Sequence, residues 1–473
     1  MSARCLARGR HSEIVISIER RSNIRMDAIS PSEPIARHRR LPRPRWFFLG
    51  AVLLVVLIVL LGIGLPAYRQ ALLLEEITRL TGNAGTQRTW PKWLYERVGE
   101  SRMRAFDKLV TVELGHTDAT DAVLRNIRSL SGLQQVDLRG TRITDVGLSY
   151  LKGLPALKGL ELSDTQVTDG CLPHLRALPS LEWLGLDNTQ VTDAGLKYLQ
   201  GHPSLVGISL SGTQITDAGL DQLEAIPTLK SLSLGNTKVG DAGVAHLKGV
   251  SSLRRLELYK TQVTDAGLES LKDCSQLTRL ALGDTQVADA GLAHLKGLTN
   301  LEELSLGNTQ LTDAGLEHLQ GLSSLKEIDL THTKITGAGL EHFKGLSKLR
   351  SVSLGDTQVT DGALASFKNL SSLDRLDLSN TQVTDAGLEH LKGLLKLRVL
   401  DLSKTKVAGI GLAQLKALPR LNLLMLAETP MTDDGLQHLK LLRELRSIGL
   451  KGTKVTAAGK ANHVRELPWV TFN

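Results

Sequence analysis

Hydrophobic residues recur along most of this chain with a period of 24 residues, and the polar residues between them repeat in the same register. One unit reads LxxLxLxxTxVTDAGLxxLKGLxx, almost unchanged at residues 373–396. A Thr marks the same position of fifteen successive units, from Thr117 to Thr453, with no insertion or deletion. The pattern predicts one array of stacked units, because a single unit is too short to bury its own apolar side chains.

Within a unit, the pattern predicts a strand followed by a helix. Counted from the Thr as position 0, apolar residues at −5 and −3 alternate with polar or small residues at −6, −4 and −2, which is typical of a short strand. Apolar residues at +7, +10 and +13 predict one face of a helix of about two turns. Thr at +3 and Asp at +4 precede that helix in twelve of fifteen units each, and both are typical N-capping residues. Gly at +12 is expected to turn the chain out of the helix, as at Gly153, Gly297, Gly321 and Gly393.

These units resemble the leucine-rich repeat family, whose LxxLxLxxN/CxL core matches each unit apart from conservative apolar exchanges and Thr in the N/C slot. The resemblance implies an α/β fold, a right-handed solenoid with a parallel sheet on its concave face and short helices on its convex face. It covers residues 109–473, as fifteen repeats and a C-terminal cap. In the family, Asn in the N/C slot bonds to backbone groups of adjacent turns, and the Thr hydroxyls are expected to do part of this.

Both ends of the array are expected to be capped. Trp90, Trp93, Leu94 and Val98 share one helical face that suits the open edge of the first unit. At the other end, Trp469 and Phe472 occupy the −8 and −5 positions of an unfinished sixteenth unit. Residues 69–108 are therefore predicted to form a juxtamembrane helix, a linker and an N-terminal cap.

Residues 46–68 contain no charged residue and no His. As a helix these 23 residues would reach about 34 Å, enough for the ~30 Å hydrocarbon core of a bilayer. They predict a single transmembrane helix that acts as an uncleaved signal-anchor; a cleaved signal peptide and a buried core helix are the alternatives. The layout as a whole resembles the membrane-anchored leucine-rich repeat proteins of bacteria.

Residues 1–45 are predicted to be a disordered, Arg-rich cytoplasmic tail, with Met26 as an alternative start. They hold eleven Arg, no Lys and four acidic residues. By the positive-inside rule, the N-terminus stays in the cytoplasm and the array is extracytoplasmic, in the periplasm or at the cell surface. A kinase or nuclear-import motif is the competing interpretation of these arginines.

The rest of the chain carries a net charge of only about +1 of the total of +8, so no nucleic-acid-binding face is expected. Seven His share position +9, among them His294, His318 and His342, but no carboxylate or Cys recurs beside them to complete a metal site. Three Cys cannot form a disulfide framework. The only dense cluster of Thr, His and Asp is 116–118, which belongs to the repeat itself. We expect no cofactor, no metal and no catalytic site.

A candidate binding site lies on the concave face, whose outward positions are mostly small or acidic. Trp183 and Tyr259 are the two array aromatics expected to project there, roughly 15 Å apart across a floor of Gly and Ser. Asp187, Arg255, Glu257 and Arg279 surround this floor. Trp, Tyr and Arg are common anchors of protein recognition. A cell-envelope glycan stacked on Trp183 is the alternative ligand, and a tolerated surface Trp without function is the plainer interpretation.

A second, weaker candidate is the concave apolar cluster of Val399, Leu423 and Met425, which would suit self-association. The function that we expect is a membrane-anchored, non-catalytic scaffold that binds a protein or an envelope ligand. The alternatives are a substrate adaptor of the ubiquitin-ligase type, because the repeats also resemble those of F-box proteins, a surface adhesin, and an enzyme.

Overall fold

The computed structural model describes residues 44–472. The chain divides into two compact units, Met1–Leu60 and Leu61–Asn473. The predicted cytoplasmic tail lies outside the described residues except for its last two positions. Of the first unit, the structure describes helix α1 (Pro44–Val59) and the first residue of the π-helix η1 (Leu60–Gly64); the apolar side chains of Phe47–Val59 are exposed.

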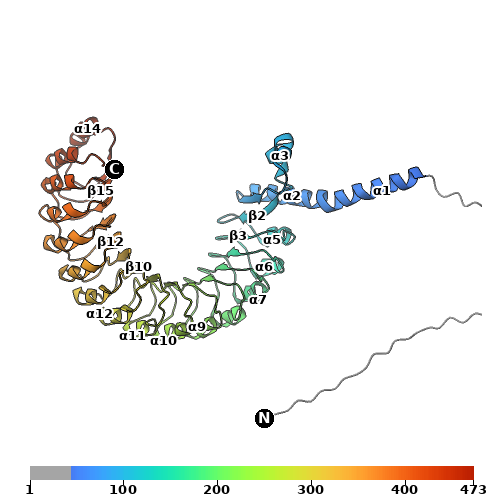
Figure 1. Cartoon of the computed structure of the whole chain (residues 1–473), viewed down its shortest axis with the longest axis horizontal. Helices are drawn as coiled ribbons and strands as arrows, with labels where there is room; N and C mark the ends of the chain where they lie inside the picture. Colours follow the sequence, from blue (N-terminus) through green and yellow to red (C-terminus); the bar gives the residue numbers. More distant parts are fainter. Residues whose placement is uncertain (1–43, 473) are drawn as a thin grey trace, which may run out of the picture. The chain divides into compact units, whose positions relative to one another are not determined.

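The second unit is a solenoid built around one sheet of 17 strands (Figure 1). Strands β2 to β17 pair in parallel in the order of the sequence, and β1 pairs with β2 antiparallel. The strands are β1 (Asn83–Gln87), β2 (Lys108–Glu113), β3 (Gln135–Asp137), β4 (Gly159–Glu161), β5 (Trp183–Gly185), β6 (Gly207–Ser209), β7 (Ser231–Ser233), β8 (Arg255–Glu257), β9 (Arg279–Ala281), β10 (Glu303–Ser305), β11 (Glu327–Asp329), β12 (Ser351–Ser353), β13 (Arg375–Asp377), β14 (Val399–Asp401), β15 (Leu423–Met425), β16 (Ser447–Gly449) and β17 (Thr471–Phe472).

Short helices cover the outer side of this arc, and the strands line its inner side (Figure 1). The α-helices are α2 (Leu65–Arg79), α3 (Lys92–Val98), α4 (Glu100–Met103), α5 (Asp121–Ile127), α6 (Asp145–Leu148), α7 (Leu172–Leu175), α8 (Asp193–Leu196), α9 (Asp217–Glu224), α10 (Asp241–His246), α11 (Asp265–Glu269), α12 (Asp289–Leu292), α13 (Asp433–Leu436) and α14 (Ala457–Glu466). The 3₁₀-helices are η2 (Ser149–Leu151), η3 (Asp169–Cys171), η4 (Lys197–Leu199), η5 (Leu247–Gly249), η6 (Ala293–Leu295), η7 (Asp313–Leu319), η8 (Ala338–Gly345), η9 (Asp361–Asn369), η10 (Gly387–Gly393), η11 (Ile410–Ala417) and η12 (Gln437–Leu441).

The predicted core positions are confirmed. In the third unit the side chains at −8, −5, −3, +2, +7, +10 and +13 are all fully buried; they are Leu157, Leu160, Leu162, Val167, Leu172, Leu175 and Leu178. The helix type was only partly predicted, because the five units from η7 to η11 are 3₁₀. A 3₁₀-helix has three residues per turn, so a spacing of three brings +7, +10 and +13 into one inward row.

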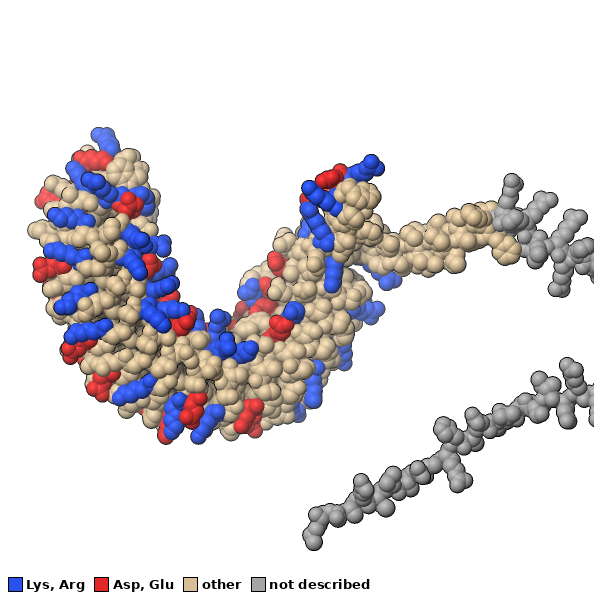
Figure 2. All heavy atoms as spheres, in the orientation of Figure 1, with Lys and Arg blue, Asp and Glu red and all other residues tan. Residues whose placement is uncertain are grey.

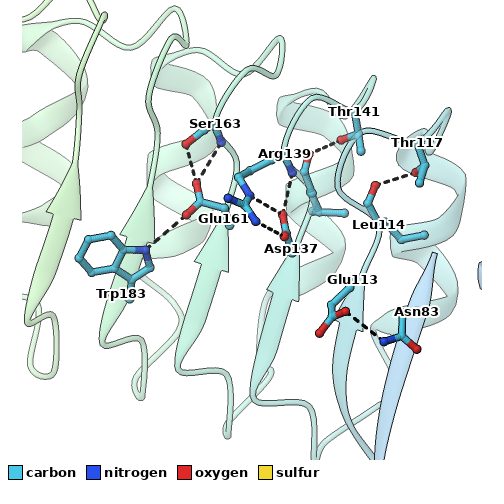
Figure 3. Close-up of polar contacts among 11 residues, drawn as sticks. Asn83, Glu113, Leu114, Thr117, Asp137, Arg139, Thr141, Glu161, Ser163 and Trp183 are labelled. Atoms are coloured by element: carbon cyan, nitrogen blue, oxygen red, sulfur yellow. Dashed lines mark hydrogen bonds and ion pairs between the residues drawn. The ribbon is translucent and has the colours of Figure 1, made fainter. Parts of the chain in front are cut away.

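The Thr at position 0 does not bond to adjacent turns, contrary to expectation. In all fifteen units its hydroxyl donates to the carbonyl oxygen three residues earlier in the same turn, as Thr117 does to Leu114 at 2.7 Å (Figure 3). The residue just before this Thr has a positive φ in every unit, among them Gly212 (68°) and Lys404 (58°). The hydroxyl therefore closes a tight left-handed turn at the end of each strand.

The polar link between turns is made by the Asp at +4, for which the N-cap prediction was wrong. The N-cap is the Thr at +3, as at Thr192, whose Oγ1 accepts the Ala194 N–H at 3.3 Å. Asp is the first residue of the helix, and its carboxylate binds the next unit instead: Asp169 accepts the Thr192 N–H and hydroxyl, both at 2.7 Å. All twelve Asp at this position accept the N–H of residue +3 in the following unit, and nine of them also accept the hydroxyl of a Thr there.

Two units lack this link because Gly337 and Gly409 replace the Asp. The Thr that follow them, Thr360 and Thr432, make no side-chain capping bond. The prediction for Gly at +12 was right at Gly153, which has φ 82°; Gly297, Gly321 and Gly393 do not have positive φ. At these three positions the backbone does not require Gly.

The N-terminal cap also differs from the prediction. Trp90, Trp93 and Val98 are exposed, by 38%, 58% and 37%, and do not seal the first unit. Leu73 and Ile77 of α2 join the array core there together with Ala84 of β1. Residues 83–87 form strand β1 rather than part of a linker, because pairing with β2 satisfies the backbone groups at that edge of the sheet. At the C-terminal end, Phe472 pairs with Ile448, as its −5 position predicts, whereas Trp469 is 50% exposed.

Candidate binding site on the concave face

Trp183 is the first residue of β5, and its ring lies flat on the sheet. A Cβ atom on Gly207, the paired residue of the next strand, would be 2.3 Å from Cε3 of Trp183, so the indole covers a position that only Gly can occupy. The indole Nε1 donates to Oε2 of Glu161 on the preceding strand at 3.4 Å (Figure 3). Trp183 therefore spans three units and keeps 39% of its surface exposed.

Tyr259, two residues beyond β8, is half-buried and leans the opposite way, toward the N-terminal units. A Cβ atom on Gly235 in the preceding unit would lie 2.2 Å from Cε1 of Tyr259. The two rings thus lean toward each other. Trp183 covers Gly207 in the unit that follows it, and Tyr259 covers Gly235 in the unit that precedes it.

The spacing of the two rings was incompletely predicted. In the sheet register, Trp183 aligns with Gly207, Ser231 and Arg255, and Tyr259 stands four residues further along its own chain than Arg255. The expected separation of roughly 15 Å between Trp183 and Tyr259 counts only the distance across the strands. Four residues add about 13 Å along them. The aromatics therefore lie at opposite corners of the candidate site, on a diagonal.

Serines and carboxylates connect the predicted site residues across this floor. Asp187 Oδ1 accepts the Ser209 hydroxyl at 2.5 Å and the Ser211 N–H at 2.7 Å. The Ser211 and Ser233 hydroxyls are 2.7 Å apart, and Ser233 donates to Glu257 Oε2 at 2.8 Å. Asp187 and Glu257, three units apart in sequence, therefore belong to one hydrogen-bonded row, which holds the floor of the site in one arrangement.

The two arginines of the predicted site differ in how they are held. Arg279 pairs with Glu257 at 3.4 Å and with Glu303 at 2.6 Å, so its guanidinium is held at the end of the serine row. The Arg255 side chain is exposed, and its guanidinium makes no hydrogen bond or ion pair with another residue of the described part of the chain. Of the two, Arg255 is the donor available to a ligand.

Burial raises the pKa of the Asp187 carboxyl above its ordinary value, and the bonds from Ser209 and Ser211 only partly oppose this; the charges of Glu161 and Glu257 add to the rise. The candidate site therefore holds a carboxylate that is costly to keep ionised. A cationic group of a ligand placed beside it would lower that cost.

Glu161 and Ser163 were missed by the sequence interpretation. Glu161 accepts both the Trp183 indole N–H and the Ser163 hydroxyl, the latter at 2.5 Å, and beside it Arg139 and Asp137 pair at 2.7 Å (Figure 3). The sequence could have indicated Glu161, because it occupies the outward −4 position of the unit just before that of Trp183. These contacts hold the outer edge of the indole in place.

The other candidate groups are separate from this site. Val399 and Leu423 pair in register, as do Asp401 and Met425, so the predicted apolar cluster exists as a patch with Met425 38% exposed. His174 has a buried Nδ1 without a hydrogen-bond partner, and the buried Nδ1 of His318 has only Glu317 Oε1 near it, at 3.4 Å. Among residues 44–472 no group of three or more His, Cys, Asp or Glu is arranged to hold a metal ion.

Family models described as "Leucine rich repeat" match residues 131–191, 275–335, 299–359 and 323–383, and a further one matches residues 225–247. The chain is a leucine-rich repeat protein. None of the curated protein sequences matches it.

Solved leucine-rich repeat structures share the fold. An internalin (inlF) from Listeria monocytogenes is 24% identical over 69% of this chain and 88% of its own, with a TM-score of 0.55. The Leptospira interrogans protein LIC12759 is 20% identical over 74% and 91%, with a TM-score of 0.54. The mouse RP105/MD-1 complex is 17% identical over 71% of this chain and 70% of its own, with a TM-score of 0.50. At these identities the likeness concerns the fold alone.

Proposed function

We propose that this leucine-rich repeat protein is a membrane-anchored, non-catalytic scaffold that binds a protein partner through its concave face. The observation that carries the proposal is the pair of inward-leaning rings, Trp183 and Tyr259, on a floor of hydrogen-bonded serines beside the free guanidinium of Arg255. Stacked repeats of this kind commonly present their concave surface to ligands. No other exposed aromatic stands on the described concave strands.

The fixed geometry supports binding rather than a loose surface. Trp, Tyr and Arg dominate the binding energy of many protein interfaces. Rings that are already held by Gly207, Gly235 and Glu161 lose little side-chain entropy when a partner covers them. The raised pKa of Asp187 favours a partner that offers a Lys or Arg at this point.

Capture from native membranes tests the site. Crosslinking followed by pull-down with the intact chain should recover a partner that the Trp183→Ala/Tyr259→Ala variant fails to recover. Trp469→Ala is the matched control, since Trp469 is also a half-exposed Trp but stands at the far end of the array. Equal recovery by the double variant and the control would refute the site.

One long apolar helix supports the proposal that the chain is anchored in a membrane. Phe47–Arg79 is the one helix among the described residues that is long and apolar enough to cross a membrane, with a mean hydropathy of 3.1 in its most apolar stretch and no burial there. The arginines before residue 46 and the acidic Glu75 and Glu76 after the span favour a cytoplasmic N-terminus and an extracytoplasmic array. Protease added to intact spheroplasts should digest the array; an array that is protected until the membrane is lysed would contradict this topology and favour the cytosolic adaptor.

A cell-envelope glycan is the second candidate ligand, because Trp183 exposes one face of an indole that lies flat on the sheet. A stacked sugar needs Trp183 but not Tyr259, which stands at the opposite corner. Binding that is lost in Trp183→Ala and kept in Tyr259→Ala would favour the glycan over a protein that spans both.

A further inference from the structure

The segment that carries α3 and α4 is fixed to helix α2 close to the end of the apolar stretch. Gln70 donates through Nε2 to the carbonyl oxygens of Arg104 at 3.1 Å and of Asp107 at 2.8 Å. Gln70 is two residues after Tyr68, which is about 3 Å along a helix axis. A bilayer that ends near Tyr68 would therefore place its surface at the level of this segment.

Three exposed aromatic side chains stand on this segment. Trp93 is 58% exposed, Phe106 42% and Trp90 38%. The Trp90 indole donates to the carbonyl oxygen of Phe106 at 3.1 Å, so these two residues are neighbours. The segment has its own anchor, because Tyr95 is buried and its hydroxyl bonds to Asp107. The aromatics are thus held outward on a fixed support and do not contribute to the array core.

Cationic side chains lie on the same segment as these rings. Arg88 and Lys92 pair with Glu100 and Glu96, whereas Arg97 and Arg102 are exposed without an acidic partner in the described chain. Figure 2 shows Lys and Arg side chains gathered at the end of the array that carries α3.

Next to Gln70, a hollow between α2 and the first unit of the array is lined by Arg69, Lys108, Ser129 and Ser131. The Lys108 stem lies across Gly132, where a Cβ atom would be 2.1 Å from Lys108 Cε. Arg69 and Lys108 therefore add two cations next to the part of α2 that holds the α3/α4 segment.

We infer that this end of the array is a second membrane contact: Trp90, Trp93 and Phe106 insert into the interfacial region of the bilayer beside the apolar helix, and the surrounding cations face lipid phosphates. The inference rests on the proposed anchor. Trp is enriched at the interface because its apolar ring and polar N–H suit that layer, and each nearby cation adds about 1 kcal/mol on an anionic surface. Two contacts would hold the array in one orientation at the membrane, whereas a single helix leaves it free to rotate.

Depth-dependent quenching of Trp emission tests this in the full chain. The chain has five Trp, so variants that keep only selected ones are made by Trp→Phe substitution: one keeps Trp46, one keeps Trp90 and Trp93, and one keeps Trp469. Each is reconstituted in phosphatidylcholine–phosphatidylglycerol vesicles with and without brominated acyl chains. Equal thermal unfolding of the three variants establishes that each is folded.

Brominated lipid should remove most of the emission of the Trp46 variant and of the Trp90/Trp93 variant, and leave that of the Trp469 variant unchanged. Quenching of Trp46 without quenching of Trp90 and Trp93 would overturn the second contact and leave the anchor intact. An unquenched Trp46 would overturn the anchor and this inference with it. Quenching of Trp469 as strongly as Trp90 and Trp93 would also overturn it, because the contact would then not be confined to this end.

Discussion

Asp193 and Thr216, in successive units, are joined by two hydrogen bonds: the Asp193 carboxylate accepts the Thr216 N–H at 2.8 Å and its hydroxyl at 2.6 Å. The same hydroxyl then accepts the N–H of Ala218 and caps the next helix. The TDAG motif is thus a link between units as well as a helix start. Because neighbouring units carry the stability of a repeat array, loss of one link weakens one interface.

Asp193→Ala is therefore expected to lower the free energy of unfolding by about 1.5–3 kcal/mol, the range for hydrogen bonds to a charged group. Urea denaturation of the whole array followed by circular dichroism measures this. Asp118→Ala is the control: Asp118 makes only an exposed pair with Arg142 at 2.8 Å, for which about 0–1 kcal/mol is expected. Equal losses in the two variants would show that the link between units contributes nothing beyond a surface charge.

At Gly195, the Gly at +6 leaves room for this link, and a double-mutant cycle can detect the effect; Cys171 is the one +6 residue with a side chain that stands beside an intact link. A Cβ atom on Gly195 would lie 2.4 Å from Oδ1 of Asp169, so Gly195→Ala should destabilise the array. In the unit that follows Gly337, where the Asp is missing, the chain itself has Ala363 at +6.

Asp169→Gly/Gly195→Ala reproduces that natural pair, and its cost should be smaller than the sum of the two single costs by about 0.5–3 kcal/mol. The free energies of unfolding of the four proteins give the coupling. Strict additivity would contradict the steric account of the motif.

The left-handed backbone conformation of the residue before each Thr at position 0 predicts that a substitution by Gly there can stabilise the array. Lys404 has φ 58°, a conformation that costs a residue with a Cβ atom about 1–2 kcal/mol. Lys404→Gly should raise the free energy of unfolding by up to about 1 kcal/mol, since Gly relieves this cost but loses more entropy on folding. Lys406→Gly, two residues away and without positive φ, should lower it by about 0.4–1 kcal/mol. A loss at both positions would contradict the assigned backbone conformation.

The carboxyls of Asp187 and Asp313 are expected to change the free energy of unfolding with pH in opposite directions. Burial raises the pKa of Asp187, so ionising it in the folded state opposes folding, and this penalty grows as pH rises from about 4 through the folded pKa. Asp187→Asn keeps an oxygen for both bonds on Oδ1, and its stability relative to the unaltered protein should rise over the same range.

For Asp313, burial alone would raise the pKa, but bonds from Thr336, Gly337 and Gly339 to both oxygens lower it overall. Its contribution is present above the unfolded pKa and is lost as pH falls through the folded pKa. Asp313→Asn places an amide NH₂ opposite N–H and O–H donors, so it should cost about 2 kcal/mol at neutral pH and less below pH 4. Urea titrations from pH 3 to 7 measure both variants; pH dependence of the same sign in both would contradict these environments.

The sequence predicted the features that repeat and missed those that depend on neighbours in space. The 24-residue period determined the strand, the buried leucines and the concave positions of Trp183 and Tyr259. It did not reveal that the rings lean over Gly207 and Gly235, because those glycines looked like ordinary small residues. The left-handed turn could have been predicted from the sequence, because ten of the fifteen residues just before the Thr at position 0 are Gly, Asn or Asp.

The Asp at +4 was misassigned because its position beside a helix start suits capping and linking equally well from sequence. Only the stacking distance brings the Asp169 carboxylate to Thr192 of the next turn. The N-terminal cap was misassigned for a related reason: the helical spacing of Trp90, Trp93 and Val98 is real, but α2 and β1 already occupy the edge of the first unit.

Site-specific photocrosslinking in native membranes shows directly which face of the array a partner contacts. A photoreactive residue at Ser231, on the floor between Trp183 and Tyr259, is compared with one at Lys248, an exposed position of η5 on the convex side. Recognition by the concave face predicts a discrete adduct from position 231, abolished by Trp183→Ala/Tyr259→Ala, and none from position 248. Adducts only from position 248, or equally from both, would contradict recognition by the concave face.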